Sequence, residues 1–375
     1  MESPQVEAEP ALEALAALAA QHAVETDRSG RFPAAVIAGF RASGLAGLIS
    51  DAEHGGKGGS LRQACAVVER LGQECGSTAM IVAMHYSAAA VIEAFGPAEA
   101  RRSVAGGDAL VTLAFSEAGS RSHFWAPVST ARREGGTIVL DANKGWVTSA
   151  SHADLYVWSS GATTGEGTSL WLVPRLTDGI AAAAAFDGMG LRGNDSAPLR
   201  AEGARIPAEN ALGEDGGGAE IMLGTVLPVF SALNAAASLG LMRGSLARTI
   251  AHAGATRFEH LDQSLRRLPT IRAYIARMQV KADMTAALLR DTLDALEHPG
   301  EATMLRVLEV KAAAAESATE VTDTAMRVCG GAAFRKEAGV DRFFRDARAS
   351  TVMAPTTDQL YDFIGRALCG LDLFE

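Results

Sequence analysis

The residues best suited to chemistry in this sequence are an aromatic side chain beside a hydroxyl, a glycine pair and two isolated histidines. Trp146 and Thr148 together can meet a planar ring that has an apolar face and a hydrogen-bonding edge. At Gly330–Gly331, main-chain N–H groups can approach a pyrophosphate. His85 and His123 have side chains that gain or lose a proton near neutral pH. Each of these features alone is more often structural, and only their combination in one chain indicates a binding site.

The elements that must position these residues fall into three groups along the chain. Apolar residues first recur at helical spacing, and the predicted helices are 11–23, 32–44, 61–75 and 77–95. Strand-like runs follow at 109–115, 137–140, 155–159 and 168–173. The helical period then returns at 221–253, 269–296, 302–329 and 356–368. The sequence therefore predicts a helical domain over 1–107, a small antiparallel β-barrel or sandwich over 108–215, and a four-helix bundle over 216–375.

Composition narrows the classes of function. Hydrophobic residues make up 48% of the chain and charged residues 21%, as in globular proteins. The net charge of −10 disfavours binding to nucleic acid or to anionic membranes. The four cysteines form no C-x-x-C pair, so neither a disulfide framework nor a metal site is predicted. The chain starts with acidic residues, unlike a signal peptide, so we expect a cytoplasmic protein whose uncharged stretch 221–242 is a buried core helix.

Four motifs, in order, resemble those of the acyl-CoA dehydrogenase superfamily. The segment 115–123 is similar to T-E-P-G-A-G-S-D, and 143–150 is similar to N-G-x-K-x-W-I-T-N. The third motif has two parts: 188–196 resembles M-G-x-R-G-S-D-T, and 205–213 resembles V-P-x-E-N-x-L-G. The fourth also has two parts: 328–334 resembles G-G-x-G-[FY], and 345–347 resembles R-D-A. The resemblance covers nearly the whole chain. It implies a mainly α fold with an N-terminal helical domain, a central β-barrel domain and a C-terminal four-helix bundle, and it implies bound FAD.

The resemblance also assigns cofactor contacts to particular positions. Those on the side of the flavin ring are Phe115, Ser116, Trp146 and Thr148. Those for the pyrophosphate and adenine end, which a neighbouring subunit supplies in the family, are Arg257, Arg327, Gly330 and Gly331. Thr356 and Asp358 are further polar contacts, although Asp358 is more simply a helix cap. A shared site implies a homodimer or a homotetramer.

The departure from the family lies at the catalytic base. In the family a Glu removes the α-proton of the thioester while the β-hydride passes to the flavin. Counting from R-D-A places Ala354 at this Glu, and the alternative position on the first bundle helix falls on Phe230. Neither side chain can accept a proton, so His85 and His123 remain as candidate acids or bases. The predicted substrate contacts are Ser122, Phe230, Met353 and Ala354.

Three functions stay open at this point. The first is FAD-dependent oxidation of an acyl thioester, carried by CoA or by a carrier protein, at Cα–Cβ with a non-standard base or coupled oxygen chemistry. The second is a flavin-dependent monooxygenase on the same fold, with oxygen in place of another external electron acceptor. The third is a non-catalytic flavin- or acyl-binding protein, which the retained flavin-side motifs disfavour.

Overall fold

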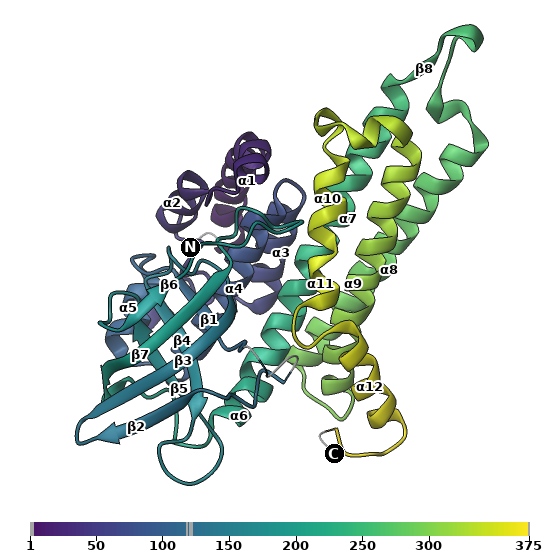
Figure 1. Ribbon diagram of the computed structural model, residues 1–375. Helices are drawn as coiled ribbons and strands as arrows, with labels where there is room; N and C mark the ends of the chain where they lie inside the picture. The colour runs from purple at the N-terminus through teal and green to yellow at the C-terminus, as the bar shows by residue number, and fades with distance from the viewer. Residues whose placement is uncertain (1–3, 118, 120–122, 374–375) are drawn as a thin grey trace.

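A computed structural model describes residues 4–117, 119 and 123–373 of the chain, and it shows a helical N-terminal part, two β-sheets and a long helical bundle (Figure 1). The N-terminal helices are α1 (Pro4–Ser29), α2 (Ala34–Ala42), α3 (Leu61–Gly72), α4 (Gly76–Phe95) and α5 (Ala98–Ala105). Helix α3 begins at a capping box, in which the Ser60 side chain accepts from the Gln63 N–H and the Gln63 side chain accepts from the Ser60 N–H. Helix α4 is buried along most of its length.

The β domain consists of two sheets that share one apolar core. One sheet has the order β1 (Val111–Ala114), β4 (Leu155–Gly161), β5 (Thr168–Pro174). The other has the order β2 (Thr130–Glu134), β3 (Thr137–Val147), β7 (Ala197–Pro207), β6 (Ile180–Ala182). The sheets pack together through side chains such as Trp158 and Trp171 of the first and Ile138 and Leu140 of the second.

Two expectations for this domain need correction. The prediction of purely antiparallel strands is wrong, because β1 pairs with β4 in parallel. Parallel neighbours need a long connection, and the chain between them provides it by forming β2 and β3 of the other sheet. The strands β2, β6 and β7 were not predicted. Strand β2 is mostly exposed and β7 carries Ala, Gly and Arg at many positions, so neither has the β-branched or aromatic enrichment that marks a strand.

The C-terminal part is built from long antiparallel helices with a short hairpin at their far end (Figure 1). Its helices are α6 (Gly218–Ile221), α7 (Leu227–Ala255), α8 (Pro269–Glu297), α9 (Thr303–Cys329), α10 (Val340–Ala347), α11 (Ala349–Val352) and α12 (Thr357–Leu368). The strands β8 (Arg257–Phe258) and β9 (Gln263–Ser264) form the hairpin between α7 and α8. The helix predicted over 221–253 is present within the helical stretch Gly218–Ala255, but it is not α-helical throughout: a π-helical turn, Met222–Val226, precedes Pro228, whose missing N–H cannot contribute to the α-helical ladder.

Two helical stretches, Gly76–Phe95 and Gly218–Ala255, are long and apolar enough to cross a membrane by length and composition alone. Their most apolar windows are 72% and 67% buried within the protein. Helices in the core of a protein are buried to this extent, as expected for 221–242. Their length and apolar composition are therefore weak evidence for membrane-spanning helices.

Helices α3 and α7 pack closely at Gly72 and Gly240, and this contact joins the N-terminal helices to the bundle. A Cβ atom added to Gly240 would lie 2.9 Å from Gly72 Cα, closer than side chains approach. A larger residue at either position would therefore push the helices apart.

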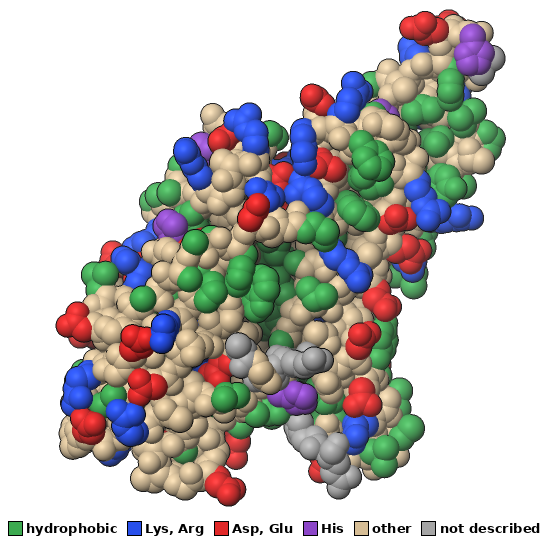
Figure 2. Space-filling model, in the orientation of Figure 1, with side chains coloured by type: hydrophobic (Ala, Val, Ile, Leu, Met, Phe, Trp, Pro, Cys, Tyr) green, Lys and Arg blue, Asp and Glu red, His purple; other side chains and the backbone are tan. Residues whose placement is uncertain are grey.

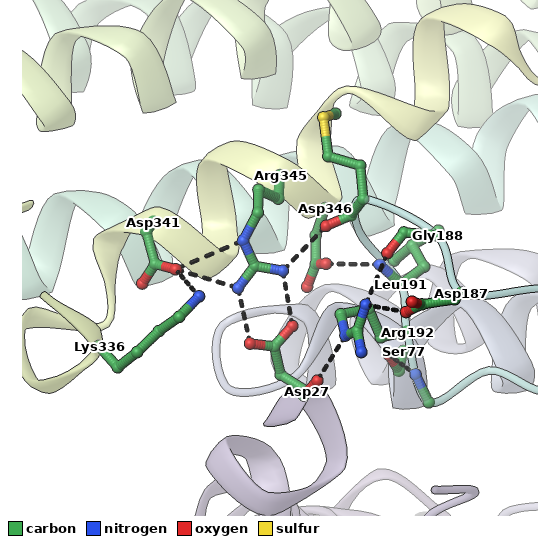
Figure 3. A network of polar contacts seen from close by, with 12 residues as sticks. Asp27, Ser77, Asp187, Gly188, Leu191, Arg192, Lys336, Asp341, Arg345 and Asp346 are labelled. Atoms are coloured by element: carbon green, nitrogen blue, oxygen red, sulfur yellow. Dashed lines mark hydrogen bonds and ion pairs between the residues drawn. The ribbon is translucent and has the colours of Figure 1, made fainter. Parts of the chain in front are cut away.

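A polar cluster joins the bundle, the N-terminal helices and the β domain (Figure 3). Arg345 of α10 makes two parallel bonds to the Asp27 carboxylate of α1, at 2.7 and 2.6 Å, and donates to Met189 O at 2.9 Å. The next residue, Asp346, is buried and accepts from the Leu191 N–H at 2.6 Å. Burial raises the pKa of Asp346 to about 6, although the Leu191 N–H opposes the shift. Residues 345–346 thereby hold three parts of the chain together.

We predict that Arg345→Ala lowers the free energy of unfolding by about 3 kcal/mol, because it leaves the Asp27 carboxylate without its partner in a site where the two side chains are only 17% and 13% exposed. Arg132→Ala is the matched control. Its ion pair with Asp141 is 56% and 42% exposed and contributes less than about 1 kcal/mol. Denaturant unfolding of both holoproteins measures the difference, and equal losses would contradict the role given to Arg345.

Candidate active site

A pocket of about 710 Å³ lies where α4, the β domain and the bundle meet. In the space-filling view this region is hollowed, with hydrophobic side chains on its walls (Figure 2). Its apolar lining residues are Met80, Met84, Leu113, Phe115, Phe124, Trp146, Phe186, Leu191, Val226, Leu227, Phe230, Ala349, Val352, Met353 and Ala354. A pocket of this kind takes an apolar group.

The first two sequence motifs lie side by side on one wall of the pocket. The Gly145 N–H donates to Ser116 O at 2.7 Å, which brings 115–117 beside β3. Phe115, Ser116, Trp146 and Thr148, the four residues predicted for the flavin ring, all line the pocket. Trp146 is 64% exposed although it is a large aromatic residue, so its face is available to a planar ligand.

Two further contributions to this wall were not predicted. The Phe186 ring lies against Trp146 with centroids 4.0 Å apart and the ring planes tilted by 32°. Ser196 Oγ lies 3.4 Å from Thr148 Oγ1. Ser196 falls in the third motif, so its position in the sequence was a usable signal. Phe186 lies in a segment of alanines without a recognisable pattern and gave none.

A buried ion pair between Glu117 and Lys144, also missed from the sequence, joins the two motifs. The Glu117 carboxylate accepts from Lys144 Nζ, from Ser129 Oγ at 2.5 Å and from the N–H groups of Val128 and Ser129 at 2.5 and 2.8 Å. Burial would raise the pKa of Glu117, but the Lys144 ammonium and the Ser129 hydrogen bonds hold it below its usual value. Lys144 also donates to Ser159 O at 2.6 Å, and burial lowers the pKa of its ammonium to about 8.

Glu117 is the one acidic side chain among the described residues that line the pocket. Both of its oxygens are occupied and its ionised form is favoured, so it has little tendency to take a proton from a substrate. Its role in the geometry is to hold the wall that carries Ser116 and Trp146.

Another part of the pocket carries the two positions that the sequence resemblance assigns to the base, an assignment that stays a prediction. Met353 and Ala354, between α11 and α12, line the pocket together with Phe230 of α7. Thr356 also lines the pocket and caps α12, since its side chain accepts from the Gln359 N–H. The expectation that Asp358 caps the helix is therefore wrong. Asp358 is exposed in the first turn and does not line the pocket.

The structure does not support the catalytic roles predicted for the two histidines. His85 is fully buried, with Nε2 3.0 Å from Ala46 O and Nδ1 accepting from the Val111 N–H at 3.3 Å. Burial lowers the pKa of His85 to about 4, so it is a neutral residue that joins α4 to β1. His123 is exposed, packs edge-on against Trp125 and does not line the pocket. Ser122, predicted to contact the substrate, lies outside the described residues.

The residues predicted for the pyrophosphate end are not brought to the pocket of the same chain. Arg257 lies in the exposed β8–β9 hairpin at the far tip of the bundle, where it pairs with Asp262 (Figure 1). Arg327 is exposed and pairs with Asp323 at 2.9 Å. Gly330 and Gly331 follow α9 with room around their Cα atoms. Their contact with a cofactor held by a neighbouring subunit stays a prediction.

Known proteins share the three-part organisation of this chain. The chain matches the family models for the N-terminal domain (residues 8–106), the middle domain (112–204) and the C-terminal domain (216–369) of acyl-CoA dehydrogenase. A probable acyl-CoA dehydrogenase of Bacillus subtilis is 28% identical over 350 residues, which cover 90% of each chain.

Solved structures share the fold. Butyryl-CoA dehydrogenase from Megasphaera elsdenii superposes with a TM-score of 0.90 at 22% identity, covering 98% of this chain and 99% of that one. A prolyl acyl carrier protein oxidase gives a TM-score of 0.87 at 20% identity, covering 98% and 100%. With family models matched over most of its length, the chain belongs to the acyl-CoA dehydrogenase family of FAD-dependent oxidoreductases.

Proposed function

We propose that this protein oxidises an acyl thioester at Cα–Cβ with FAD and without a carboxylate base of its own. The observation that carries the proposal is the pocket wall formed by Phe230 and Ala354, neither of which can accept a proton. Glu117, the acidic residue of the opposite wall, is held ionised by Lys144. The described lining of the pocket therefore offers no free carboxylate to take the α-proton, and we expect its removal to be slow.

The pocket fits the flavin ring. The exposed face of Trp146 suits the apolar plane of the ring, and the main chain and hydroxyls of Ser116 and Thr148 suit its polar edge. Bound FAD supplies the chemistry of hydride acceptance. The protein's own part is to orient the ring against the Trp146 wall and to exclude water with the apolar residues around it.

The rest of the pocket supports a substrate with an apolar acyl group. Met80 and Met84 of α4 face the cavity together with Phe230 and Met353. No Lys or Arg is found among the described lining residues, so recognition of the thioester's CoA or carrier-protein portion takes place outside the pocket.

A second candidate is oxygen chemistry on the same bound thioester. The observation that favours it is the same pair, Phe230 and Ala354, because a reaction that needs no α-proton transfer has no use for the missing carboxylate.

We predict that the holoprotein reduces its flavin slowly when it is mixed with butyryl-CoA or octanoyl-CoA without oxygen. General base catalysis contributes about 10²–10⁴-fold, and this contribution is missing here. Stopped-flow absorbance of the flavin measures the rate. Slow anaerobic bleaching supports dehydrogenation, and product formed only after external reduction and admission of air supports oxygen chemistry. Rapid bleaching of the wild type would contradict the loss of the base.

We predict that Ala354→Glu combined with Pro355→Gly raises the anaerobic reduction rate by roughly 10²-fold or more, because it places a carboxylate at the position of the family's base. The glycine is included because Pro355 has a fixed φ and restricts residue 354. Pro355→Gly alone is the control for the backbone change, and Phe230→Glu tests the alternative position. A double variant that binds FAD and acyl-CoA without any gain would show that Ala354 does not occupy the base position.

We predict that Arg257→Ala weakens FAD retention by about 10-fold or more, because a hydrogen bond to a charged phosphate contributes roughly 1.5–3 kcal/mol. This follows from the proposed sharing of the cofactor between subunits of a homodimer or homotetramer. The FAD content after dialysis measures the effect, with Arg132→Ala, an exposed arginine on β2, as the control. Unchanged retention by the Arg257 variant would contradict the shared site.

A further inference from the structure

Lys311 of α9 is a fully buried lysine whose ammonium is bound by main-chain carbonyls. Its Nζ donates to Met353 O at 3.0 Å and to Pro355 O at 2.7 Å. Within the part of the chain that the structure describes, no carboxylate forms an ion pair with it. A buried ammonium without a counter-ion is costly, so burial lowers the pKa of Lys311 to about 7. Both the charged and the neutral amine can donate to the two carbonyls.

The two carbonyls belong to the residues on either side of Ala354. Hydrogen bonds to both neighbours fix the path of the main chain at 353–355, and with it the direction of the Ala354 side chain. The same Nζ lies 5.8 Å from the centre of the Phe230 ring, within reach of a cation–π interaction. One amino group therefore contacts the Phe230 ring and both neighbours of Ala354, the two positions proposed for the base.

Lys311 is not itself a lining residue of the pocket, and the segment that it binds lies between it and the cavity. It can act on a ligand only through the main chain at 353–355 and through its charge. We propose that Lys311 is a positioning residue, which fixes the Met353–Pro355 segment against Phe230 and, when it is protonated, places a positive charge behind Ala354.

This proposal rests on the proposed function, because it takes Ala354 as the base position. Its test introduces a reporter thiol by Ala354→Cys and measures alkylation by iodoacetamide, peptide by peptide, between pH 6 and pH 9 in the holoprotein. No turnover is needed. Cys369 is exposed and serves as the internal control, whereas burial raises the pKa of Cys65, Cys75 and Cys329 and keeps them unreactive.

A nearby ammonium favours the thiolate, so it lowers the apparent pKa of the reporter thiol at position 354. We expect Lys311→Met to slow alkylation of this thiol at pH 6, where Lys311 is charged, by about 10-fold, since one pKa unit is a tenfold change in thiolate, and to leave Cys369 unchanged. Lys311→Arg retains both donors and stays charged at every pH, and we expect it to restore the rate seen with Lys311 at pH 6. Thr322→Val is the matched control, because Thr322 is also buried on α9 but bonds only to main-chain oxygens of its own helix.

Lys311→Gln separates the effect of hydrogen bonding from the effect of charge. It also replaces Lys311→Met in the test if the Met variant does not fold. The Gln side chain can donate to a carbonyl without carrying charge. Hydrogen exchange of the main-chain N–H groups over 353–360 should therefore remain slower in this variant than in Lys311→Met. The reporter thiol, which responds to the charge, should react as slowly as in Lys311→Met. Identical pH profiles for the reporter thiol with Lys, Met, Gln or Arg at position 311 would overturn the role of Lys311 alone. A reporter thiol that stays unreactive in every background would instead show that residue 354 does not face the pocket, which overturns the proposed site as well.

Discussion

The pocket depends on the polar cluster at residues 345–346, because its walls come from three parts of the chain. Arg345 binds Asp27 of α1, and Asp346 binds the main chain at Leu191 in the β domain. The same stretch continues within a few residues into the Met353–Thr356 wall of the pocket. An interaction that joins α1, the β domain and the bundle is thus also the anchor of the segment that faces the ligand (Figure 3).

Two buried lysines stabilise opposite walls of the pocket in different ways. Lys144 is paired with Glu117, so charge is neutralised where the flavin-side motifs meet. Lys311 is bound by carbonyl oxygens, so its protonated form is solvated by dipoles but not neutralised.

The sequence was sufficient for the fold because long helices with a regular apolar period and four ordered motifs agreed with one another. Local departures from the regular pattern were harder to predict: the π-helical turn before Pro228 lies in a helix that hydrophobicity alone makes regular, and β2 is an exposed edge strand with little apolar signal. In the site, Trp146, Thr148 and Phe230 were placed from motifs. Phe186 and Lys311 act through three-dimensional contacts that no spacing reveals, and His85 was misjudged because burial cannot be read from a single residue.

The central claim is that no carboxylate of the protein reaches the α-carbon of a bound acyl thioester. A crystal structure of the holoprotein with a bound, non-reactive acyl-CoA analogue measures this directly, through the distance from the ligand's α-carbon to the nearest Asp or Glu oxygen. We expect the Ala354 side chain to face that carbon beside Phe230, with Glu117 still bound to Lys144. A carboxylate oxygen within contact distance of the α-carbon, from any residue of this chain or of a neighbouring subunit, would contradict the account.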